Sequence, residues 1–350
     1  MNEAVHHDNH SVRQAFYDRL GQQHLAPLWP RLPELVTLTP RSRCQPHLWR
    51  YADLYSAAME AGSLVNMQEA ERRVIILENP GLQNSSCITT TLYAGLQMIQ
   101  PGEIAPSHRH SQSAIRLAMS GDGAYTVVDN ERTLLQRGDL VLTPPMVWHD
   151  HGNDGDEPAT WLDGLDIPLV QFFDASFLER ATEPAQAVTR NDGDSWYSYA
   201  RSMRAVDDHS SFLASPVVNY PYQHAKETLL QTAGSAKRNP FHGTKMAYLN
   251  PLNGGHVLPT MAAFLQLLNK GLRTAPYRSS DATVYVVQEG SGRTWIGEHD
   301  ICWGPRDIFV VPSWHWIRHQ ADEEAVLFSY SDRPAQEKLG LWREQCGENE

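Results

Sequence analysis

Two stretches of this 350-residue chain decide how it folds. The first is Gly102-Glu103-Ile104-Ala105-Pro106-Ser107-His108-Arg109-His110, and the second runs from Gly138 through Pro144 to His149 and Asn153. Successive side chains of a strand point to opposite faces, so His108 and His110 share one face. With His149 they form a set of three imidazoles, which suits a mononuclear metal centre that keeps open coordination positions. The sequence therefore predicts His108, His110 and His149 as metal ligands.

The spacing of glycine, proline and histidine in these stretches resembles the cupin fold, a small antiparallel β-barrel of the jelly-roll type. Many metal-binding cupins place a glutamate shortly after the histidine pair as a fourth ligand. Residues 111–115 contain no acidic side chain. Three neutral ligands leave a divalent ion with its full charge, so we expect the site to accept an acidic substrate that chelates the ion.

The second half of the chain repeats the first. Thr91–Ile99 aligns with Thr260–Leu268 at an offset of 169, and the same offset places Gly121 and Gly123 on Gly290 and Gly292. Repeats at a fixed offset indicate duplication of a structural unit. The predicted fold is therefore mainly β, a bicupin of two tandem antiparallel barrels with helical N-terminal and linker segments.

The metal ligands are not repeated. At the corresponding positions the three histidines are replaced by Tyr277, Ser279 and Ile317, and Arg116 and Asp163 are replaced by Tyr285 and Ser329. Of the candidate site residues, His151 alone keeps a histidine counterpart, His319. We therefore expect one metal ion per chain, in the first barrel, and a second barrel without metal.

The expected domain limits follow from where strand-like and helix-like stretches alternate. We expect a helical N-terminal segment at residues 1–72, the catalytic cupin at 73–170, a helical linker at 171–245, and the second barrel with a C-terminal tail at 246–350. The composition of residues 261–268 favours a helix, but their alignment with the strand before the first histidine pair favours a buried strand.

Composition excludes several classes of function. The formal net charge is -12 and no basic cluster occurs, so a nucleic-acid partner is not expected. No run of 18 apolar residues could span a membrane, and the N-terminus lacks the features of a signal peptide. The four cysteines show neither metal-binding nor disulfide spacing, which favours reduced thiols in a cytoplasmic protein.

Several further motifs carry a resemblance to one family. They are Pro101-Gly102-Glu103, Ser113-Ala114-Ile115-Arg116, Gly123-Ala124-Tyr125-Thr126-Val127 and Trp148-His149-Asp150-His151-Gly152-Asn153, and in the second half Glu289-Gly290-Ser291-Gly292, Val311-Pro312-Ser313-Trp314 and Glu337-Lys338-Leu339-Gly340-Leu341. The chain resembles the gentisate 1,2-dioxygenases, whose relatives act on salicylate and 1-hydroxy-2-naphthoate. The resemblance implies Fe(II), a homotetramer, and insertion of both atoms of O2 between the carboxyl-bearing and hydroxyl-bearing ring carbons, which converts gentisate to maleylpyruvate.

Other residues receive expected roles from charge, strand parity and this resemblance. Arg116 shares the ligand face and could bind the substrate carboxylate, or it could form an ion pair with a buried acid. Arg72 corresponds to a family position near the substrate but could equally lie at the surface. Gln97 and His151 are candidates to hold the substrate phenolate or the bound oxygen.

Three positions are expected to determine substrate choice. Tyr93 and Gly95 lie on the same strand face as Gln97 and are expected to form the wall of the substrate site. Asp163 has no acidic counterpart in the second barrel. It could accept the proton of the 5-hydroxyl group of gentisate, or it could orient a histidine ligand.

Two alternatives remain at this stage. One is a dioxygenase for salicylate or 1-hydroxy-2-naphthoate, which lack the 5-hydroxyl group. The other is a non-catalytic bicupin that stores or senses a metal or ligand. The complete set of three histidines argues against storage, and no pair of DNA-binding helices supports a sensor.

Overall fold

The computed structural model describes residues 3–235 and 238–348. The chain divides into two compact units, Met1–Arg41 and Ser42–Glu350. The first unit contains α1 (Glu3–Gln22) and α2 (Leu32–Leu35). No helix among the described residues is long and apolar enough to cross a membrane.

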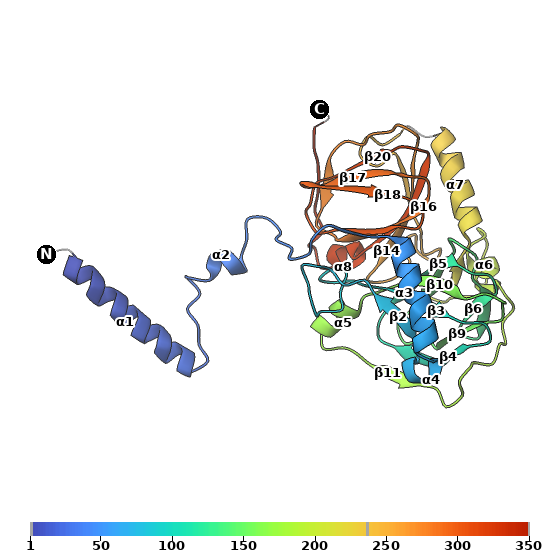
Figure 1. The fold of residues 1–350 in the computed structure, drawn as a ribbon, viewed down its shortest axis with the longest axis horizontal. Coiled ribbons are helices and arrows are strands. Elements are labelled where there is room, and N and C mark those ends of the chain that lie inside the picture. Colours follow the sequence, from blue (N-terminus) through green and yellow to red (C-terminus); the bar gives the residue numbers. More distant parts are fainter. Residues whose placement is uncertain (1–2, 236–237, 349–350) are drawn as a thin grey trace. The chain divides into compact units, whose positions relative to one another are not determined.

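The second unit consists of two β-sheet halves, the first of which carries the histidine motifs (Figure 1). Its strands form a six-stranded sheet in the order β12-β8-β5-β10-β3-β2 and a five-stranded sheet in the order β11-β4-β9-β6-β7. The main strands are β2 (Arg73–Ile76), β3 (Tyr93–Ile99), β4 (Ile104–His110), β5 (Ala114–Ser120), β6 (Ala124–Val128), β7 (Glu131–Leu134), β8 (Leu140–Thr143), β9 (His149–Asn153) and β10 (Ala159–Leu165).

The second half repeats this arrangement with one six-stranded sheet, β1-β19-β16-β21-β14-β13, and one five-stranded sheet, β18-β17-β20-β15-β22. Its main strands are β13 (Thr244–Ala247), β14 (Ala262–Leu268), β15 (Tyr277–Ser279), β16 (Thr283–Glu289), β17 (Gly292–Ile296), β18 (His299–Trp303), β19 (Ile308–Val311), β20 (Ile317–Ala321) and β21 (Ala325–Ser331). The mainly β, two-cupin fold predicted from the sequence is therefore confirmed, and so is the strand expected near residues 261–268.

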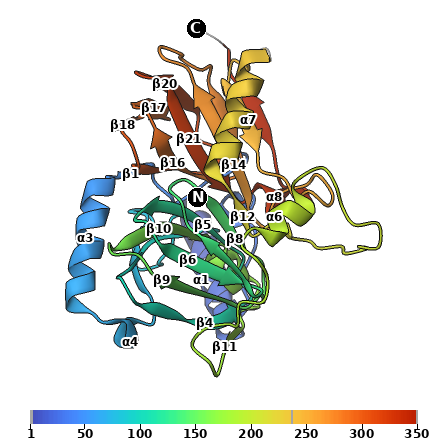
Figure 2. The same ribbon diagram turned by 90° about the vertical axis from the view of Figure 1, so that its right-hand side faces the viewer.

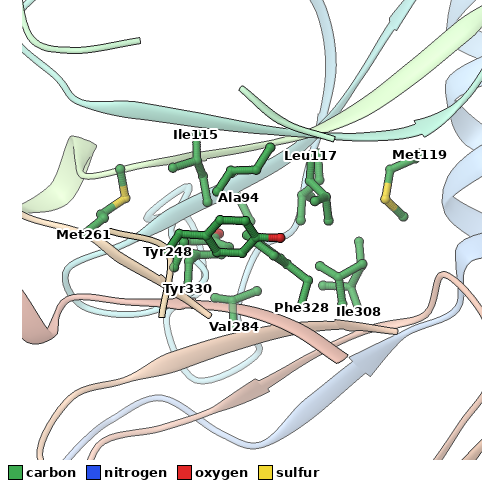
Figure 3. Packing of buried hydrophobic residues seen from close by; sticks show 14 of the residues in the cluster. Ala94, Ile115, Leu117, Met119, Tyr248, Met261, Val284, Ile308, Phe328 and Tyr330 are labelled. Carbon is green, nitrogen blue, oxygen red and sulfur yellow. The ribbon is translucent and has the colours of Figure 1, made fainter. Parts of the chain in front are cut away.

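The two halves pack against each other through their six-stranded sheets. Ile115 and Leu117 from β5 face Val284 from β16 and Phe328 from β21 across a largely apolar layer (Figure 3). Alternate residues of the same strands point the other way, into the two barrels. Each sheet is therefore apolar on the face between the halves, and the opposite face is available for a site.

A short strand and a helix precede each half, and these two elements connect the halves crosswise. β1 (His47–Trp49) pairs with β19 of the second half, whereas α3 (Tyr51–Leu64) contacts β2 and β3 of the first. β12 (Asn219–Tyr220) pairs with β8 of the first half, whereas α7 (Tyr222–Ser235) contacts β13 and β14 of the second (Figure 2). The short strand and the helix that precede each barrel thus belong to the duplicated unit.

Two aspartates that correspond to each other in the repeat, Asp307 and Asp139, each bind the first residue of one of these helices. Asp307 Oδ1 accepts a hydrogen bond of 3.0 Å from the backbone N–H of Tyr51, and Asp139 Oδ1 accepts one of 2.8 Å from that of Tyr222. A carboxylate at a helix N-terminus satisfies a backbone donor that has no partner within the helix. Because both contacts are built alike, they date from the duplicated unit.

A second reciprocal pair of contacts joins the halves. Asp166, after β10, accepts a hydrogen bond from the hydroxyl group of Thr260 in the second half. Asp332, after β21, accepts one of 2.9 Å from the hydroxyl group of Thr91 in the first half. Each aspartate also binds a backbone N–H of its own half, that of Ser113 or Ala282.

The other helices and strands of the second unit are short. The remaining elements are α4 (Met67–Ala70), α5 (Ile167–Phe172), β11 (Leu178–Arg180), α6 (Asp194–Tyr199), α8 (Arg333–Lys338) and β22 (Glu344–Cys346). Phe173 and Phe177 are exposed, and the chain that follows them pairs with β4 as strand β11.

Candidate metal centre

The three predicted ligands meet on the inner face of the five-stranded sheet of the first half. His108 and His110 lie on β4, and His149 begins the neighbouring strand β9, directly opposite His108. A potential ligand atom of each residue lies within 4.8 Å of those of the other two. Arg109 between them points outward, where it contacts Trp148 and pairs with Glu179 at 2.6 Å. Strand alternation therefore brings together the histidines that the sequence selected.

The surroundings of these imidazoles keep them neutral and orient their rings. The Nδ1 atoms of His110 and His149 lie 2.9 and 3.0 Å from the carbonyl oxygens of Gln112 and Val147. An Nδ1–H group that donates to a carbonyl leaves Nε2 with its lone pair free. Burial lowers the pKa of His108 to about 2 and that of His110 to about 4, and it lowers the pKa of His149 well below its ordinary value.

These residues fit a divalent metal ion. His149 is fully buried, yet its Nε2 atom has no hydrogen-bond partner among the residues that the structure describes. A buried nitrogen without a partner is costly in a folded protein, and a metal bond would satisfy it. Among the described residues no carboxylate belongs to the cluster, so its potential donor atoms are three neutral nitrogens.

His151 and Gln97 lie deeper in the same barrel. The ring of His151 is fully buried, and neither of its nitrogens has a hydrogen-bond partner. Its ring centre lies 5.7 Å from that of His149 and 5.4 Å from that of Trp161. Gln97, 1 % exposed, lies opposite Trp161 in the sheet, and its Nε2 also lacks a partner. Both side chains therefore keep unused donors or acceptors close to the histidine cluster.

Arg116 and Asp163 form a buried ion pair on the facing sheet. They lie opposite each other in β5 and β10, and Arg116 Nε is 3.2 Å from Asp163 Oδ1. Nη1 of Arg116 donates to Thr143, whereas among the described residues no hydrogen bond from Nη2 is found. The alternative expected for Arg116, a pair with a buried acid, is thus present. The guanidinium still has an unused donor.

Asp163 has an environment that changes its acidity. Burial raises the pKa of its carboxyl group to about 6, although the nearby Arg116 acts in the opposite direction. Trp161 Nε1 donates to Asp163 Oδ1 at 3.2 Å, and no hydrogen bond from Asp163 to a histidine occurs among residues 3–235 and 238–348. These contacts do not support the alternative in which Asp163 orients a histidine ligand.

Arg72 reaches the histidine cluster from the turn between α4 and β2. Its Nη2 donates to the carbonyl oxygen of Pro106 at 2.6 Å and contacts Nδ1 of His108. Burial lowers the pKa of Arg72 to about 10, and the charge of Arg116 acts in the same direction. The neighbouring Arg73 points elsewhere and pairs with Glu103. Arg72 therefore lies beside the histidine cluster and is not directed only toward solvent.

Tyr93 and Gly95 form part of the wall beside Asp163. A Cβ atom on Gly95 would lie 2.6 Å from the Tyr93 hydroxyl oxygen and 2.4 Å from Cγ1 of Val74. The glycine therefore gives room to the phenol ring of Tyr93. Burial, and next the charge of Asp163, raise the pKa of Tyr93, so this phenol stays protonated.

Sequence reasoning missed two residues of the site, Trp161 and Thr143. Trp161 is fully buried, contacts His151 and donates to Asp163. Thr143 accepts from Arg116. Both share a strand face with recognised residues: Trp161 is two positions before Asp163 in β10, and Thr143 lies in β8 beside β5. Parity along β10 could have identified Trp161.

The corresponding registers confirm how the repeat was aligned. Tyr277 lies opposite Ile317, as His108 lies opposite His149. Tyr285 lies opposite Ser329, as Arg116 lies opposite Asp163. The second half therefore keeps the framework of the site without its ligands.

Comparisons with known proteins agree with this geometry. Residues 95–165 match the family model described as Cupin domain. The chain is 54 % identical to gentisate 1,2-dioxygenase 1 of Aquipseudomonas alcaligenes, covering 95 % of this chain and 96 % of that protein. It is 36 % identical to 5-aminosalicylate 1,2-dioxygenase of Comamonas sp, covering 95 % and 90 %.

A solved structure is similar over almost the whole length. The salicylate 1,2-dioxygenase of Pseudoaminobacter salicylatoxidans, in a structure described as an adduct with gentisate, is 33 % identical and has a TM-score of 0.92. The match covers 97 % of this chain and 94 % of that one. With the full-length identities above, it shows that this chain belongs to the gentisate 1,2-dioxygenase family.

Proposed function

We propose that this protein is an Fe(II)-dependent ring-cleaving dioxygenase that opens gentisate between its carboxyl-bearing and adjacent hydroxyl-bearing carbons and gives maleylpyruvate. The main observation in support is a cluster of three neutral imidazoles near the buried Arg116–Asp163 pair and the half-buried Arg72. The 54 % identical relative is named a gentisate 1,2-dioxygenase.

The charges around the cluster favour an anionic aromatic substrate. Arg72 and Arg116 contribute two positive charges, and Asp163 contributes at most one negative charge. No carboxylate neutralises a metal bound by the three histidines. In a desolvated site such an excess of positive charge strongly stabilises a bound carboxylate anion. A 2-hydroxybenzoate offers a carboxylate and an adjacent oxygen at the spacing of a chelate ring.

Iron is proposed because the reaction requires an ion that exchanges electrons with O2. When bound by His108, His110 and His149, Fe(II) would hold the acid and O2 together and let electrons pass from the ring to oxygen. The neutral imidazoles would leave Fe(II) accessible to an anionic ligand. One ion per chain is expected, since Tyr277, Ser279 and Ile317 replace the ligands in the second barrel.

The protein side chains would bind and orient the ring. Arg116, through its unused Nη2 donor, would bind the substrate carboxylate, and Arg72 would support it from the turn before β2. Tyr93 and Gly95 would form the wall against the ring. These assignments match the residues expected from the sequence.

Two further residues would control protons and hydrogen bonds. Asp163 would accept the proton of the 5-hydroxyl group, because its carboxyl group with a pKa of about 6 is ionised at neutral pH. Removing that proton makes the ring richer in electrons. Gln97 and His151, which keep unpartnered polar atoms, would hydrogen-bond the substrate oxygen next to the carboxylate or the bound O2.

The test is anaerobic loading with Fe(II), then addition of gentisate and air, with oxygen uptake and new near-ultraviolet absorbance as readouts. Oxygen uptake equal to the gentisate consumed is the expected result. Salicylate and 1-hydroxy-2-naphthoate, which lack the 5-hydroxyl group, serve as comparison substrates. Turnover of these acids without turnover of gentisate would move the protein to one of the related activities. Bound iron without uptake for any acid would contradict ring cleavage.

Three further proposals concern the oligomeric state, the cellular location and the domain limits. We propose a homotetramer, which sedimentation or light scattering would test. We propose a cytoplasmic location, with Cys44, Cys87, Cys302 and Cys346 all free thiols in the structure. We also propose that residues 73–170 form the catalytic domain, preceded by residues 1–72, followed by the linker at 171–245, and completed by the second barrel at 246–350.

A further inference from the structure

One side chain of the metal-free half reaches the back of the candidate site. Tyr330 lies on β21 and is fully buried in the apolar layer between the halves (Figure 3). Its hydroxyl group donates a hydrogen bond of 3.0 Å to the backbone carbonyl of Tyr93, the first residue of β3. The ring extends from the second half onto the six-stranded sheet that carries Tyr93, Gly95 and Gln97.

The ring of Tyr330 occupies a gap directly behind Asp163. A Cβ atom on Gly164 would lie 2.8 Å from Cζ of Tyr330 and equally close to Ile115. No backbone conformation requires a glycine here, so Gly164 makes space for the ring. Gly164 pairs with Ala94 in the sheet, and the flanking pairs Asp163–Gly95 and Leu165–Tyr93 lie on either side. Tyr330 therefore contacts both strands where they present Asp163 and Tyr93 to the site.

Unlike the paired aspartate–threonine contacts between the halves, this contact is not reciprocal. Asp166 and Asp332 each bind a threonine of the opposite half, as expected from duplication. The position that corresponds to Tyr330 in the first half is Gly164, because Ser329 and Asp163 correspond. A tyrosine is thus directed only toward the half with the histidine cluster. A requirement for packing alone would not explain that direction.

We propose that Tyr330 is a positioning residue: the second barrel uses it to fix the edge of β3 and β10, so that Tyr93 and Asp163 meet the ring of the bound acid in one orientation. The inference rests on the proposed function. It gives the metal-free barrel a part in substrate binding and selectivity. Small displacements of groups that contact a substrate reduce turnover strongly, which makes such a support measurable.

Electrostatics agree with this placement. The pKa of Tyr330 is raised by its burial and, next, by the charges of Tyr93 and Asp163. The hydroxyl group therefore remains a donor at all physiological pH values. It cannot be replaced by water without opening the apolar layer that surrounds it, because Ile115, Val284 and Phe328 are all buried there.

The test compares Tyr330→Phe with Tyr248→Phe. Tyr248 belongs to the same apolar cluster, is almost completely buried, and has a hydroxyl group without a partner. Removing either hydroxyl changes the core by one oxygen atom, so differences between the two variants report the contact with Tyr93. We expect Tyr330→Phe to lower kcat/KM for gentisate by about tenfold and to reduce the preference for gentisate over salicylate. Tyr248→Phe should leave both unchanged.

Two further readouts separate positioning from stability. Metal content and melting temperature should stay within the range of Tyr248→Phe, and calorimetry with zinc-loaded protein, which cannot turn over, should show weaker gentisate binding. Gly164→Ala, which displaces the ring and keeps the hydroxyl group, should give the same selectivity change if Tyr330→Phe does not fold. Kinetics and zinc-form affinity of Tyr330→Phe equal to those of Tyr248→Phe would overturn the inference. Wild-type protein that binds zinc and gentisate but cleaves no acid would instead count against the proposed function.

Discussion

The two halves of the second unit have the same framework and opposite interiors. In the first, three imidazoles face two arginines and an ionisable carboxyl group. In the second, Phe264 stands opposite Ser329 where the first half has Gly95 opposite Asp163. The strand registers are unchanged. Fold and chemistry are therefore specified by different faces of the same strands, and one face can change while the other is kept.

The second interior also contains a cation of its own. Lys245 lies on β13 with its Nζ atom 4.8 Å from the ring centre of Phe264 and 5.5 Å from that of Tyr285. Burial lowers its pKa to about 8, and the charge of Arg333 acts in the same direction. A lysine that is charged at neutral pH repels a divalent ion. This half therefore lacks the ligands and also carries a charge that opposes metal binding.

The strongest test of this comparison replaces one histidine in each half. His149→Ala removes a ligand, so metal affinity should fall by more than the 10- to 100-fold that is typical for residues outside the ligand set, and turnover should be lost. His319→Ala removes a buried histidine of the second half whose Nδ1 atom is hydrogen-bonded to the hydroxyl group of Thr294. This variant should still bind one metal ion per chain. Metal analysis of both proteins is the measurement. Two metals in wild-type protein, or retained metal in His149→Ala, would contradict the contrast between the halves.

The second test concerns the carboxyl group that the second half lacks. Replacing Asp163 by serine, the residue at position 329, should lower kcat for gentisate by roughly 10²- to 10⁴-fold if Asp163 accepts a proton. Since its pKa is about 6, the wild-type rate should rise with pH through that value as the carboxylate forms. Salicylate has no 5-hydroxyl group, so it provides the control substrate.

The outcome for this prediction depends on the pH profile. In Asp163→Ser the rise near pH 6 should disappear for gentisate, while metal content stays the same. A profile that keeps its rise in the variant would assign that step to another group. A loss of equal size for both acids would mean that Asp163 acts only through its ion pair with Arg116.

Much of the site was predictable because it lies on strands with clear motifs. The alternation of side chains along a strand predicts that His108, His110 and Arg116 point into the barrel. The repeat shows that the corresponding positions of the second half hold other residue types. Proximity across the barrel was less predictable. Arg72 lies outside the regular strands, in a turn, so no periodicity indicated whether it pointed to solvent or to His108.

Contacts between the halves could not be predicted from either repeat alone. The pairing of β1 with β19 and of β12 with β8 joins residues more than 70 positions apart in sequence, and both strands are very short. Tyr330 appeared in the sequence as one more aromatic residue of a buried strand. The space that Gly164 leaves for the Tyr330 ring could not be predicted from the sequence, because a glycine adds nothing to a hydrophobic pattern.

A smaller effect is expected where the first half keeps a glycine and the second has a phenylalanine. Gly95→Ala would place a methyl group 2.4 Å from Val74 Cγ1 and 2.6 Å from the Tyr93 hydroxyl oxygen, so both side chains must move. We expect KM for gentisate to rise by about tenfold with a smaller change in kcat, because the wall moves and the metal does not. Val74→Ala added to Gly95→Ala should restore part of the affinity. Unchanged KM in the single variant would exclude Gly95 from the wall.

The smallest effects are expected at the reciprocal threonine contacts. Thr91→Val and Thr260→Val each remove a hydroxyl donor from a buried aspartate of the opposite half. A hydrogen bond to a charged group contributes about 1.5–3 kcal/mol, so each variant should lose up to that amount of free energy of unfolding at pH 8. Denaturant titration measures it. Turnover in Thr260→Val should equal that of the wild type, because its contacts lie outside the candidate site.

The pH dependence makes this last comparison sharper. Burial raises the pKa of Asp332 from 3.8 to about 6, so between these values the folded protein holds a proton that the unfolded chain has released. The stability contributed by this group therefore falls as pH rises through that window. The Thr91 hydroxyl donates to the carboxylate and lowers the pKa of Asp332, so without it the fall should extend to higher pH and be larger in total. Thr91→Val should thus be closer to wild-type stability at pH 5 than at pH 8.

The contact between Asp166 and Thr260 should show the same pH dependence. Burial also raises the pKa of Asp166, and the hydrogen bond from Thr260 lowers it. Thr260→Val should therefore also be closer to wild-type stability at pH 5 than at pH 8. If only one of the two variants shows this dependence, the halves are held together by unequal contacts, and the duplicated interface has diverged as the two interiors have.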